Sequence, residues 1–308
     1  MALQSSWLVV EHGRTPTSRV AGRTLRKRLD AVWTALRAAA GDPSDPERVH
    51  RLRVATRRTL AALDAFDTLL PDRKRRWFEK RLRRLRRTAG AARDLDVLAD
   101  RLGREPAAAE AAAGSSRTRL VAMLSRQRLA SRAPIRRMLD ELVAADWHAR
   151  TERLVDAVGH RGRDRSFAAH ARRRFRPLVE RFFATADRHL RSADDIHRLR
   201  IEGKKLRYAM EIFAGVFPAA ERARCEEALE RLQRTLGEFT DHAAAEDRLR
   251  RWARADGAAA ARRSIVDLRE HEAEAADRAR KAFTKWWSPA RRRWLRRKFE
   301  RTLRRRTA

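Results

Sequence analysis

The chain has 308 residues and a formal net charge of +33 at pH 7, with 74 lysines and arginines against 41 aspartates and glutamates. So much charge repels itself in a compact fold, and a polyanionic partner such as nucleic acid, polyphosphate or an anionic membrane would offset the repulsion. The lone Cys225 excludes a disulfide framework and a cysteine metal site. No apolar stretch approaches the roughly 20 residues of a membrane span, and none resembles a secretion signal, so we expect a cytoplasmic protein.

Helices are predicted along the whole first half. The 12 glycines and 9 prolines fall between stretches rich in alanine, leucine, arginine and glutamate, and this composition favours an all-α fold. Apolar spacing predicts helices over residues 18–40, 46–70, 71–102 and 117–147. Asp45 is the expected N-cap of the second helix, residues 103–116 form a break, and Pro134 perturbs the fourth helix.

The second half follows the same plan. A linker over residues 151–166, with Gly159 and Gly162, leads to helices predicted over 167–190, 195–217, 219–255 and 258–287, the second of them capped by Asp194 or Asp195. A basic tail follows Ser288, and its Leu295, Phe299 and Leu303 share one helical face. We expect the tail to dock on the body or to add contacts to a polyanion; contact with an anionic membrane surface is the alternative.

The two halves are related by an internal repeat. The sequence Val49-His-Arg-Leu-Arg-Val-Ala-Thr-Arg-Arg returns 147 residues later as Ile196-His-Arg-Leu-Arg-Ile-Glu-Gly-Lys-Lys. The same offset pairs Leu82 with Leu229, Gly90 with Gly237, Asp94 with Asp241 and Leu102 with Leu249, and the first helices match at an offset of 150. The repeat predicts two four-helix bundles. The expected organisation is an N-terminal tail (1–16), a first repeat (17–150), a linker (151–166), a second repeat (167–288) and a basic C-terminal tail (289–308).

The second helix of each repeat carries a stripe of cations. On a helical wheel His50, Arg53 and Arg57 lie one turn apart, opposite the apolar side. His197, Arg200 and Lys204 repeat the stripe, and its neighbours are Arg51, Arg58, Arg198, Lys205 and Arg207, with Arg23, Arg26, Arg173 and Arg176 added by the first helices. Such a row fits a linear anion with regular charge, and arginine meets phosphate oxygens in a bidentate way. The alternative is a solvated arginine face with structural histidines.

No enzymatic motif emerges beside this stripe. The matched Asp94 and Asp241 could be metal or catalytic carboxylates, but a structural role, such as pairing with arginine, is preferred. The chain has no Gly-rich phosphate loop, no G-x-S-x-G and no H-E-x-x-H. The sequence therefore predicts a binding protein with no catalytic residues, no metal and no cofactor.

These motifs resemble those of a known family, the CHAD domain, the "conserved histidine α-helical domain". The match is carried by Val49 to Arg58 with Leu63 and Phe66, by Ala89-Gly-Ala-Ala-Arg-Asp-Leu-Asp-Val, and by their second-repeat counterparts, and spans residues 17–287. The resemblance implies two bundles related by a pseudo-two-fold axis around a basic central groove or pore. It also implies binding of inorganic polyphosphate and association with polyphosphate granules. The E-x-E-x-K strand of the triphosphate-tunnel domain that many relatives carry is not found.

The leading functional hypothesis is therefore non-enzymatic polyphosphate binding, tighter at mildly acidic pH because a polyanion favours charged histidine. A nucleic-acid binder is the alternative, although the basic helices offer few residues that read or stack bases. A phosphoanhydride-processing enzyme is third, because the stripe lacks a carboxylate pair for a divalent metal.

Overall fold

The computed structural model describes residues 11–42, 45–104, 110–158, 165–188, 190 and 192–304. These residues form helices, with one isolated β-bridge between Pro16 and Ser166, which confirms the predicted all-α fold. The first half contains α1 (Thr17–Gly41), α2 (Pro46–Ala65), α3 (Asp72–Arg104), α4 (Glu110–Ala130), α5 (Ala133–Ala144) and α6 (Trp147–Asp156). The second contains α7 (Phe167–Ala186), α8 (Ala193–Ile212), α9 (Ala219–Ala253), α10 (Arg262–Trp286) and α11 (Pro289–Arg304).

Parts of four predicted segments lie outside the described residues. They are residues 1–10 of the N-terminal tail, 105–109 of the predicted break, 159–164 of the linker with Gly159 and Gly162, and the last four residues of the C-terminal tail.

The central helices end earlier than predicted, in both halves for the same reason. α2 stops at Ala65 and α8 at Ile212, and a short 3₁₀ turn follows each (Asp67–Leu69 and Ala214–Val216). Leu70 and Phe217 are then extended and precede Pro71 and Pro218. A proline ring disfavours helical backbone at the residue before it, so the chain leaves the helix before the proline is reached.

Other boundaries also differ from the prediction, among them the end of α7 at Ala186 (predicted at 190) and the start of α10 at Arg262 (predicted at 258). The stretch predicted as one helix over 117–147 is divided among α4, α5 and α6, and Pro134 lies in the first turn of α5, where its missing N–H costs nothing. α6 runs to Asp156, so the predicted start of the linker falls inside a helix. The N-cap of α8 is Ser192, whose side chain forms a capping box with Asp195; Asp45 caps α2 as predicted.

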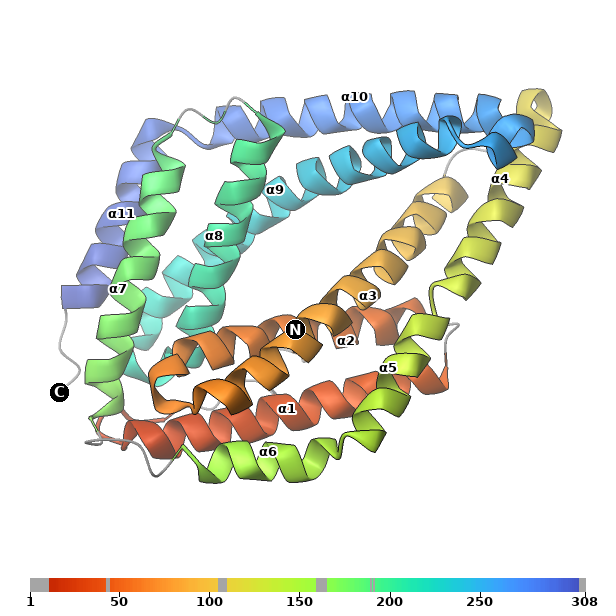
Figure 1. Cartoon of the computed structure of the whole chain (residues 1–308). Coiled ribbons are helices and arrows are strands. Elements are labelled where there is room, and N and C mark those ends of the chain that lie inside the picture. The colour runs from red at the N-terminus through yellow and green to blue at the C-terminus, as the bar shows by residue number, and fades with distance from the viewer. Residues whose placement is uncertain are drawn as a thin grey trace.

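The helices form a frame around a central region (Figure 1). α10 runs along the top, α11 and α7 along the left, α1 and α6 along the bottom, and α5 and α4 on the right, while α9 descends from the upper right toward the lower left. In each half the first three helices pack in sequence, α1 on α2 on α3 and α7 on α8 on α9, and α2 also packs on α8. The inner helices α2, α3, α8 and α9 therefore bring the two predicted cation stripes toward one another.

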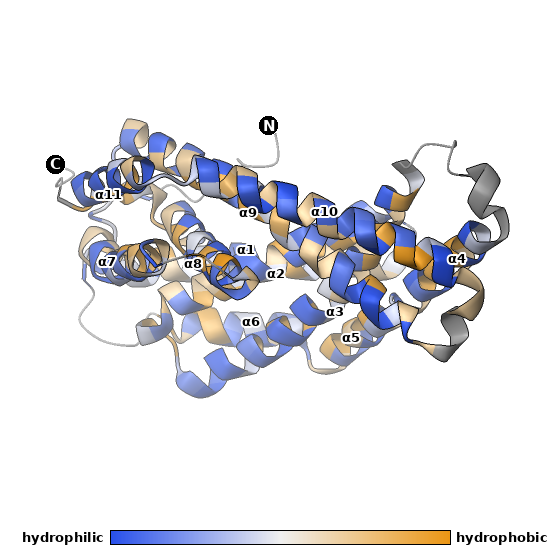
Figure 2. Ribbon diagram, turned by 90° about the horizontal axis from the view of Figure 1, so that it is seen from above, coloured by the Kyte–Doolittle hydropathy of each residue, from blue (hydrophilic) through white to orange (hydrophobic). Residues whose placement is uncertain are grey.

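Two apolar clusters hold this frame. The larger one joins both halves and includes Leu25, Leu52, Phe66, Leu206 and Phe213, all fully buried. The smaller one closes the far end, where leucines of α3 and α4 meet leucines of α9 and α10. Figure 2 shows blue and orange residues alternating along the helices, as expected where one face is buried and the other is wet.

The starts of the two halves exchange backbone hydrogen bonds reciprocally. Thr17 N donates to Arg165 O (3.1 Å) and Phe167 N donates to Thr15 O (3.0 Å), on either side of the Pro16–Ser166 bridge. Thr17 and Phe167 are equivalent positions 150 residues apart, as are Thr15 and Arg165, and 150 is the offset that relates α1 to α7 in the sequence. Replacing each residue by its counterpart in the other half turns one of these hydrogen bonds into the other, as expected of an internal duplication.

The C-terminal helix α11 docks on the body, as one of the predicted alternatives states. Leu295 and Phe299 are buried, and the Phe299 ring contacts Phe175 and Phe183 of α7 (6.1 and 6.0 Å between centroids). The apolar face of α11 is therefore covered by protein and is not free to enter a membrane. None of the described helices has the length and apolar character of a membrane span.

Candidate functional site

A cavity of about 210 Å³ lies between the two halves. Four inner helices line it with residues of both repeats: His50, Arg53, Arg57, Arg93, Asp94, Val97, Leu98, Arg200, Asp241, Ala244, Ala245 and Arg248. Arg53 and Arg200, Asp94 and Asp241, Val97 and Ala244, and Leu98 and Ala245 are matched at the 147-residue offset. Four residues of the two predicted stripes, His50, Arg53, Arg57 and Arg200, therefore line one cavity, which we call the central cavity below; His197 and Lys204 are not among its lining residues.

The amphipathic pattern of α2 and α8 directs their cations inward. Leu52 and Leu199 are fully buried, so the residues that follow them, Arg53 and Arg200, lie on a different side of each helix. Both guanidinium groups are partly covered, with side-chain exposures of 30% and 16%. The site is therefore shielded, and its charges act in a lower effective dielectric than surface charges.

Asp94 and Asp241 pair with arginine, which supports the structural role preferred from the sequence. Arg53 lies 3.6 Å from Asp94, and the matched Arg200 lies 3.3 Å from Asp241. Arg248 of α9 also reaches Asp94 of the other half (3.5 Å). Five arginines and two aspartates line the central cavity, so positive charge remains in excess.

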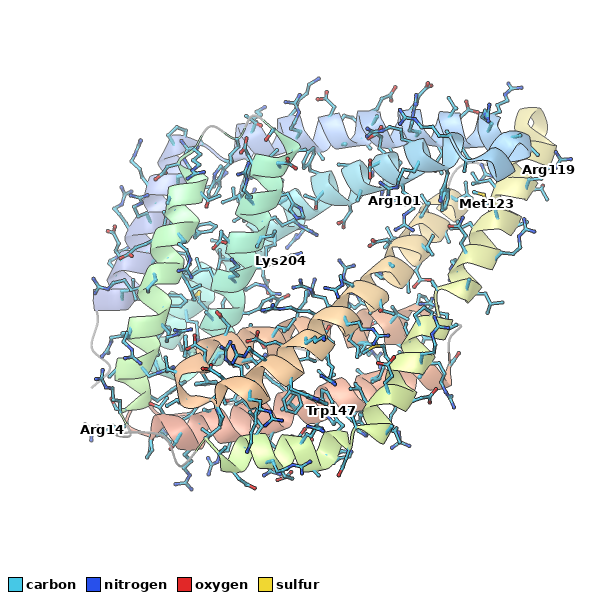
Figure 3. The ribbon with its side chains drawn as sticks, viewed as in Figure 1. Arg14, Arg101, Arg119, Met123, Trp147 and Lys204 are labelled. Atoms are coloured by element: carbon cyan, nitrogen blue, oxygen red, sulfur yellow. The ribbon has the colours of Figure 1, made fainter. Side chains whose placement is uncertain are left out.

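Burial and mutual repulsion lower the pKa values of the cations in this region. The pKa of Lys204 falls to about 7, first through burial and then through Arg200 and Arg57. Figure 3 shows Lys204 on α8, inside the frame of helices. The pKa of His50 is also lowered, chiefly by burial and also by the nearby arginines, Arg93 first among them. Burial and repulsion therefore disfavour the charged form of both groups, and a nearby anion would favour it.

Two buried guanidinium nitrogens of the cavity lack hydrogen-bond partners. Among the described residues, Nε of Arg57 and Nε of Arg200 have no acceptor, as is also true of Nε of Arg28, Arg75 and Arg222 outside the cavity. Burial also lowers the pKa of both arginines, and neighbouring arginines lower it further. An anion in the cavity would supply acceptors and opposite charge at once.

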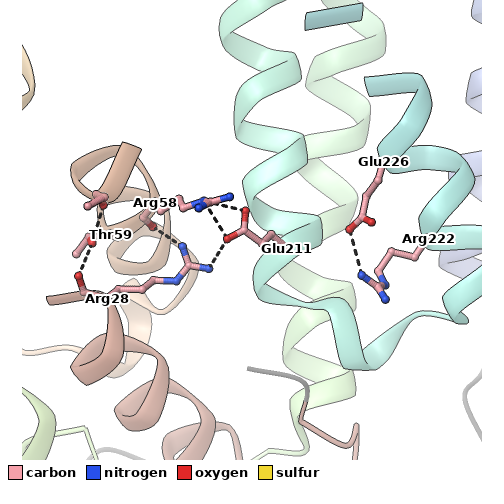
Figure 4. A network of polar contacts seen from close by, with 7 residues as sticks. Arg28, Arg58, Thr59, Glu211, Arg222 and Glu226 are labelled. Atoms are coloured by element: carbon pink, nitrogen blue, oxygen red, sulfur yellow. Dashed lines mark hydrogen bonds and ion pairs between the residues drawn. The ribbon is translucent and has the colours of Figure 1, made fainter. Parts of the chain in front are cut away.

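Arg58 is a correction to the predicted set. It is buried, and its Nε lies 3.2 Å from Glu211 of α8, which also accepts a hydrogen bond from the buried Arg28 (3.1 Å). Figure 4 shows Arg28, Arg58 and Glu211 converging at the crossing of the two halves. Arg58 joins the halves and does not face the anion site.

Other predicted cations of α2 and α8 point outward. Arg51, Arg198 and Lys205 are exposed and pair with carboxylates of their own helices, Glu47 (3.5 Å), Asp195 (3.1 Å) and Glu202 (2.6 Å). Arg207 donates to Gln233 (3.1 Å) and stacks on Tyr208. His197 is exposed and does not line the central cavity, so the two histidines occupy different environments.

The predicted arginines of the first helices do not line the central cavity. Arg23 pairs with Glu11 (2.8 Å), and Arg26 pairs with Glu152 of α6 on the outer side of α1. Arg173 is exposed, and Arg176 lines a separate groove with Arg296 of α11. The wheel of a single helix could not show which neighbouring helix each arginine would meet.

Sequence reasoning missed the cavity residues of the third helices. Arg93 and Arg248 line the cavity, and Arg101, the 147-residue match of Arg248, reaches the Asp241 carbonyl oxygen of the other half (3.4 Å). The match of Arg101 with Arg248 was a usable signal, since it continues the register noted at Leu102 and Leu249. Arg93 has Thr240 at its matched position and gave no repeat signal.

The described residues contain no group of three or more His, Cys, Asp or Glu side chains arranged to hold a metal.

Comparisons with known proteins agree with this architecture. The model of one family, the CHAD domain, matches residues 23–250. The chain is similar to the crystal structure of the CHAD domain from the plant Ricinus communis, at 22% identity and a TM-score of 0.73, over 95% of this chain and 94% of that one. It is also similar to PptA from Streptomyces chartreusis, at 19% identity and a TM-score of 0.59, over 89% of this chain and 99% of that one. No curated protein sequence matches it.

Proposed function

Because the chain belongs to the CHAD domain family, we propose that it binds inorganic polyphosphate in the central cavity without transforming it. The proposal includes residues 17–288 as one CHAD domain and a location at polyphosphate granules. The observation that carries it is the matched pair Arg53 and Arg200, brought into one cavity with an excess of arginine and with unsatisfied Nε donors at Arg57 and Arg200.

Polyphosphate fits the chemistry of this cavity. Its phosphate oxygens accept the guanidinium donors, and its regular charge relieves the repulsion that lowers the pKa values of Lys204 and His50. Displacing counterions from the polyanion adds a salt-dependent gain, as for nucleic acids. Both cavity carboxylates already hold arginine, so neither is placed as a general base.

The test is a double substitution, Arg53→Gln with Arg200→Gln. Long-chain polyphosphate affinity should fall by about 100-fold, if each charged hydrogen bond contributes about 1.5 kcal/mol. The slope of log K against log salt should also decrease by about two. Calorimetry across a salt series measures both quantities, and circular dichroism verifies that the helices remain.

The control removes the same charge elsewhere. Arg137→Gln with Arg293→Gln changes two exposed arginines that do not line the cavity. It should lower affinity by less than about threefold, because exposed charges are screened. Equal losses from the two double variants would show that net charge alone attracts polyphosphate, and the central cavity would then not be its binding site.

A further inference from the structure

A second cavity lies at the junction of α9, α10 and α11, outside the matched family segment of 23–250 apart from its α9 wall. Its volume is about 710 Å³, within the usual range for small-molecule sites. We call it the Trp/Arg groove; its lining includes Arg224, Glu227, Arg231, Trp286, Trp287, Arg291, Trp294 and Arg297. It combines three indole rings, four guanidinium groups and one carboxylate, which sets it apart from the central cavity.

The aromatic part of the groove is anchored on one side and open on the other. Trp287 is buried and stacks on Trp286, with 5.6 Å between ring centroids. Trp286 in turn carries the guanidinium groups of Arg291 and Arg231 at 4.6 and 5.3 Å from its ring centroid. Trp294 is different, because 41% of it is exposed. Lys298 Nζ lies 5.4 Å from the centroid of the Trp294 ring, and the exposed part of this indole offers a stacking surface for a planar ring.

The arginines of the groove have no carboxylate partner in the part of the chain that the structure describes: none of Arg224, Arg231, Arg291 and Arg297 forms an ion pair there. Two of them are engaged in other ways, since Arg291 donates to the Trp286 carbonyl oxygen (2.5 Å) and both Arg291 and Arg231 lie over the Trp286 ring. The groove therefore keeps a cluster of unpaired guanidinium groups next to an aromatic surface.

The single carboxylate narrows the ligand class. A bare polyphosphate has no hydrogen-bond donor for the Glu227 carboxylate and no planar ring for the indoles. A nucleobase stacks on an aromatic ring, and its amino groups donate to a carboxylate. We propose that the Trp/Arg groove binds a nucleoside phosphate, with the base on Trp294 and the phosphates on the arginines. This is a site separate from the central cavity and independent of polyphosphate binding.

The experiment compares ADP with inorganic pyrophosphate, which share phosphates and differ by the nucleoside. Calorimetry on the full chain should show tighter binding of ADP than of pyrophosphate. Trp294→Ala should weaken ADP binding by about tenfold, the size of one base-stacking contact, and leave pyrophosphate binding unchanged. Trp294→Phe, which keeps an aromatic face, should restore most of the affinity, and Arg293→Ala, on the same helix outside the groove, should change neither.

The two sites are separated by crossing the variants. Arg53→Gln with Arg200→Gln should leave ADP binding intact, and Trp294→Ala should leave polyphosphate binding intact. The groove proposal is wrong if ADP binds no tighter than pyrophosphate, if Trp294→Ala leaves ADP affinity unchanged, or if the cavity variant abolishes ADP binding. It is also wrong if only single-stranded RNA, or only vesicles of equal phosphatidylcholine and phosphatidylglycerol, bind in a Trp294-dependent way.

Discussion

Two neighbouring arginines of α2 lie in opposite environments. Arg57 lines the central cavity, and its Nε has no partner among the described residues. Arg58 is buried against Glu211, a carboxylate of the other half that also holds Arg28. The comparison shows that residue type alone does not decide what an arginine does here. Arg58 meets a carboxylate of the opposite half and joins the two halves, whereas Arg57 faces the central cavity, where a ligand could reach it.

The largest effect should come from removing the carboxylate at the crossing. Glu211→Ala leaves Arg28, which is 2% exposed, and the buried Arg58 without their shared counter-charge. Breaking a buried ion pair from one side costs about 3–5 kcal/mol of the free energy of unfolding. Urea denaturation of the wild type and variant measures this loss. Glu226→Ala is the control: its ion pair with Arg222 is drawn in Figure 4, and because these side chains are 30% and 20% exposed the loss should be less than about 1 kcal/mol. Equal losses of unfolding free energy in the two variants would contradict the view that Glu211 is the more important of the two carboxylates.

The affinity of the central cavity for polyphosphate should depend on pH. The pKa of Lys204 is about 7 in the folded chain, against an ordinary value of 10.5, and that of His50 lies below 6.5. A bound polyanion favours the charged form of both, so binding takes up protons and affinity falls as pH rises, by at most about tenfold per pH unit for each proton taken up. In the free protein the sign is opposite. Folding disfavours charged Lys204, so this penalty on stability is fully present below pH 7 and fades as pH rises toward 10.5.

Two substitutions assign the pH dependence. Lys204→Arg keeps the charge at all pH values and should flatten the affinity profile above about pH 7, where the lysine loses its proton. His50→Gln should flatten the profile below about pH 6.5 and leave the upper part unchanged. Calorimetry at fixed ionic strength between about pH 6 and pH 9 measures both. A wild-type profile that is already flat would remove both side chains from the binding mechanism.

A smaller gain is expected from removing the cavity's own carboxylates. Asp94→Asn frees Arg53 and Arg248 from their shared partner and should raise polyphosphate affinity by about threefold, since a partly exposed pair contributes less than about 1 kcal/mol. Asp140→Asn is the matched control, because it removes the same charge beside Arg136 on α5, away from the cavity, and should have no measurable effect. A loss of affinity in Asp94→Asn would mean that the aspartate positions the arginines for the anion.

The sequence predicted this cavity only in part, and the reason is physical. The 147-residue repeat placed Arg53 and Arg200 in equivalent positions, and the apolar side of each helix predicted the side they would take. The sequence alone could not show that Glu211 of α8 would pair with Arg58 of α2, because tertiary contacts decide which charged side chains meet. For the same reason it could not show that α6 would meet Arg26. Helix ends were missed where a local rule was overlooked, as at Leu70 before Pro71.

The smallest effect should come from the outward-facing cations of α2 and α8. The triple variant Arg51→Gln, Arg198→Gln and Lys205→Gln removes three charges, one more than the cavity double variant, from exposed side chains that already pair on their own helices. If such a cation bound polyphosphate, it would only exchange its carboxylate partner for a phosphate, and salt screens both interactions. Polyphosphate affinity should therefore fall by less than about twofold. A loss as large as that of Arg53→Gln with Arg200→Gln would mean that the anion runs along the outer faces of both helices. The contrast between inward and outward cations would then have no functional meaning, because three exposed charges would count as much as two shielded ones.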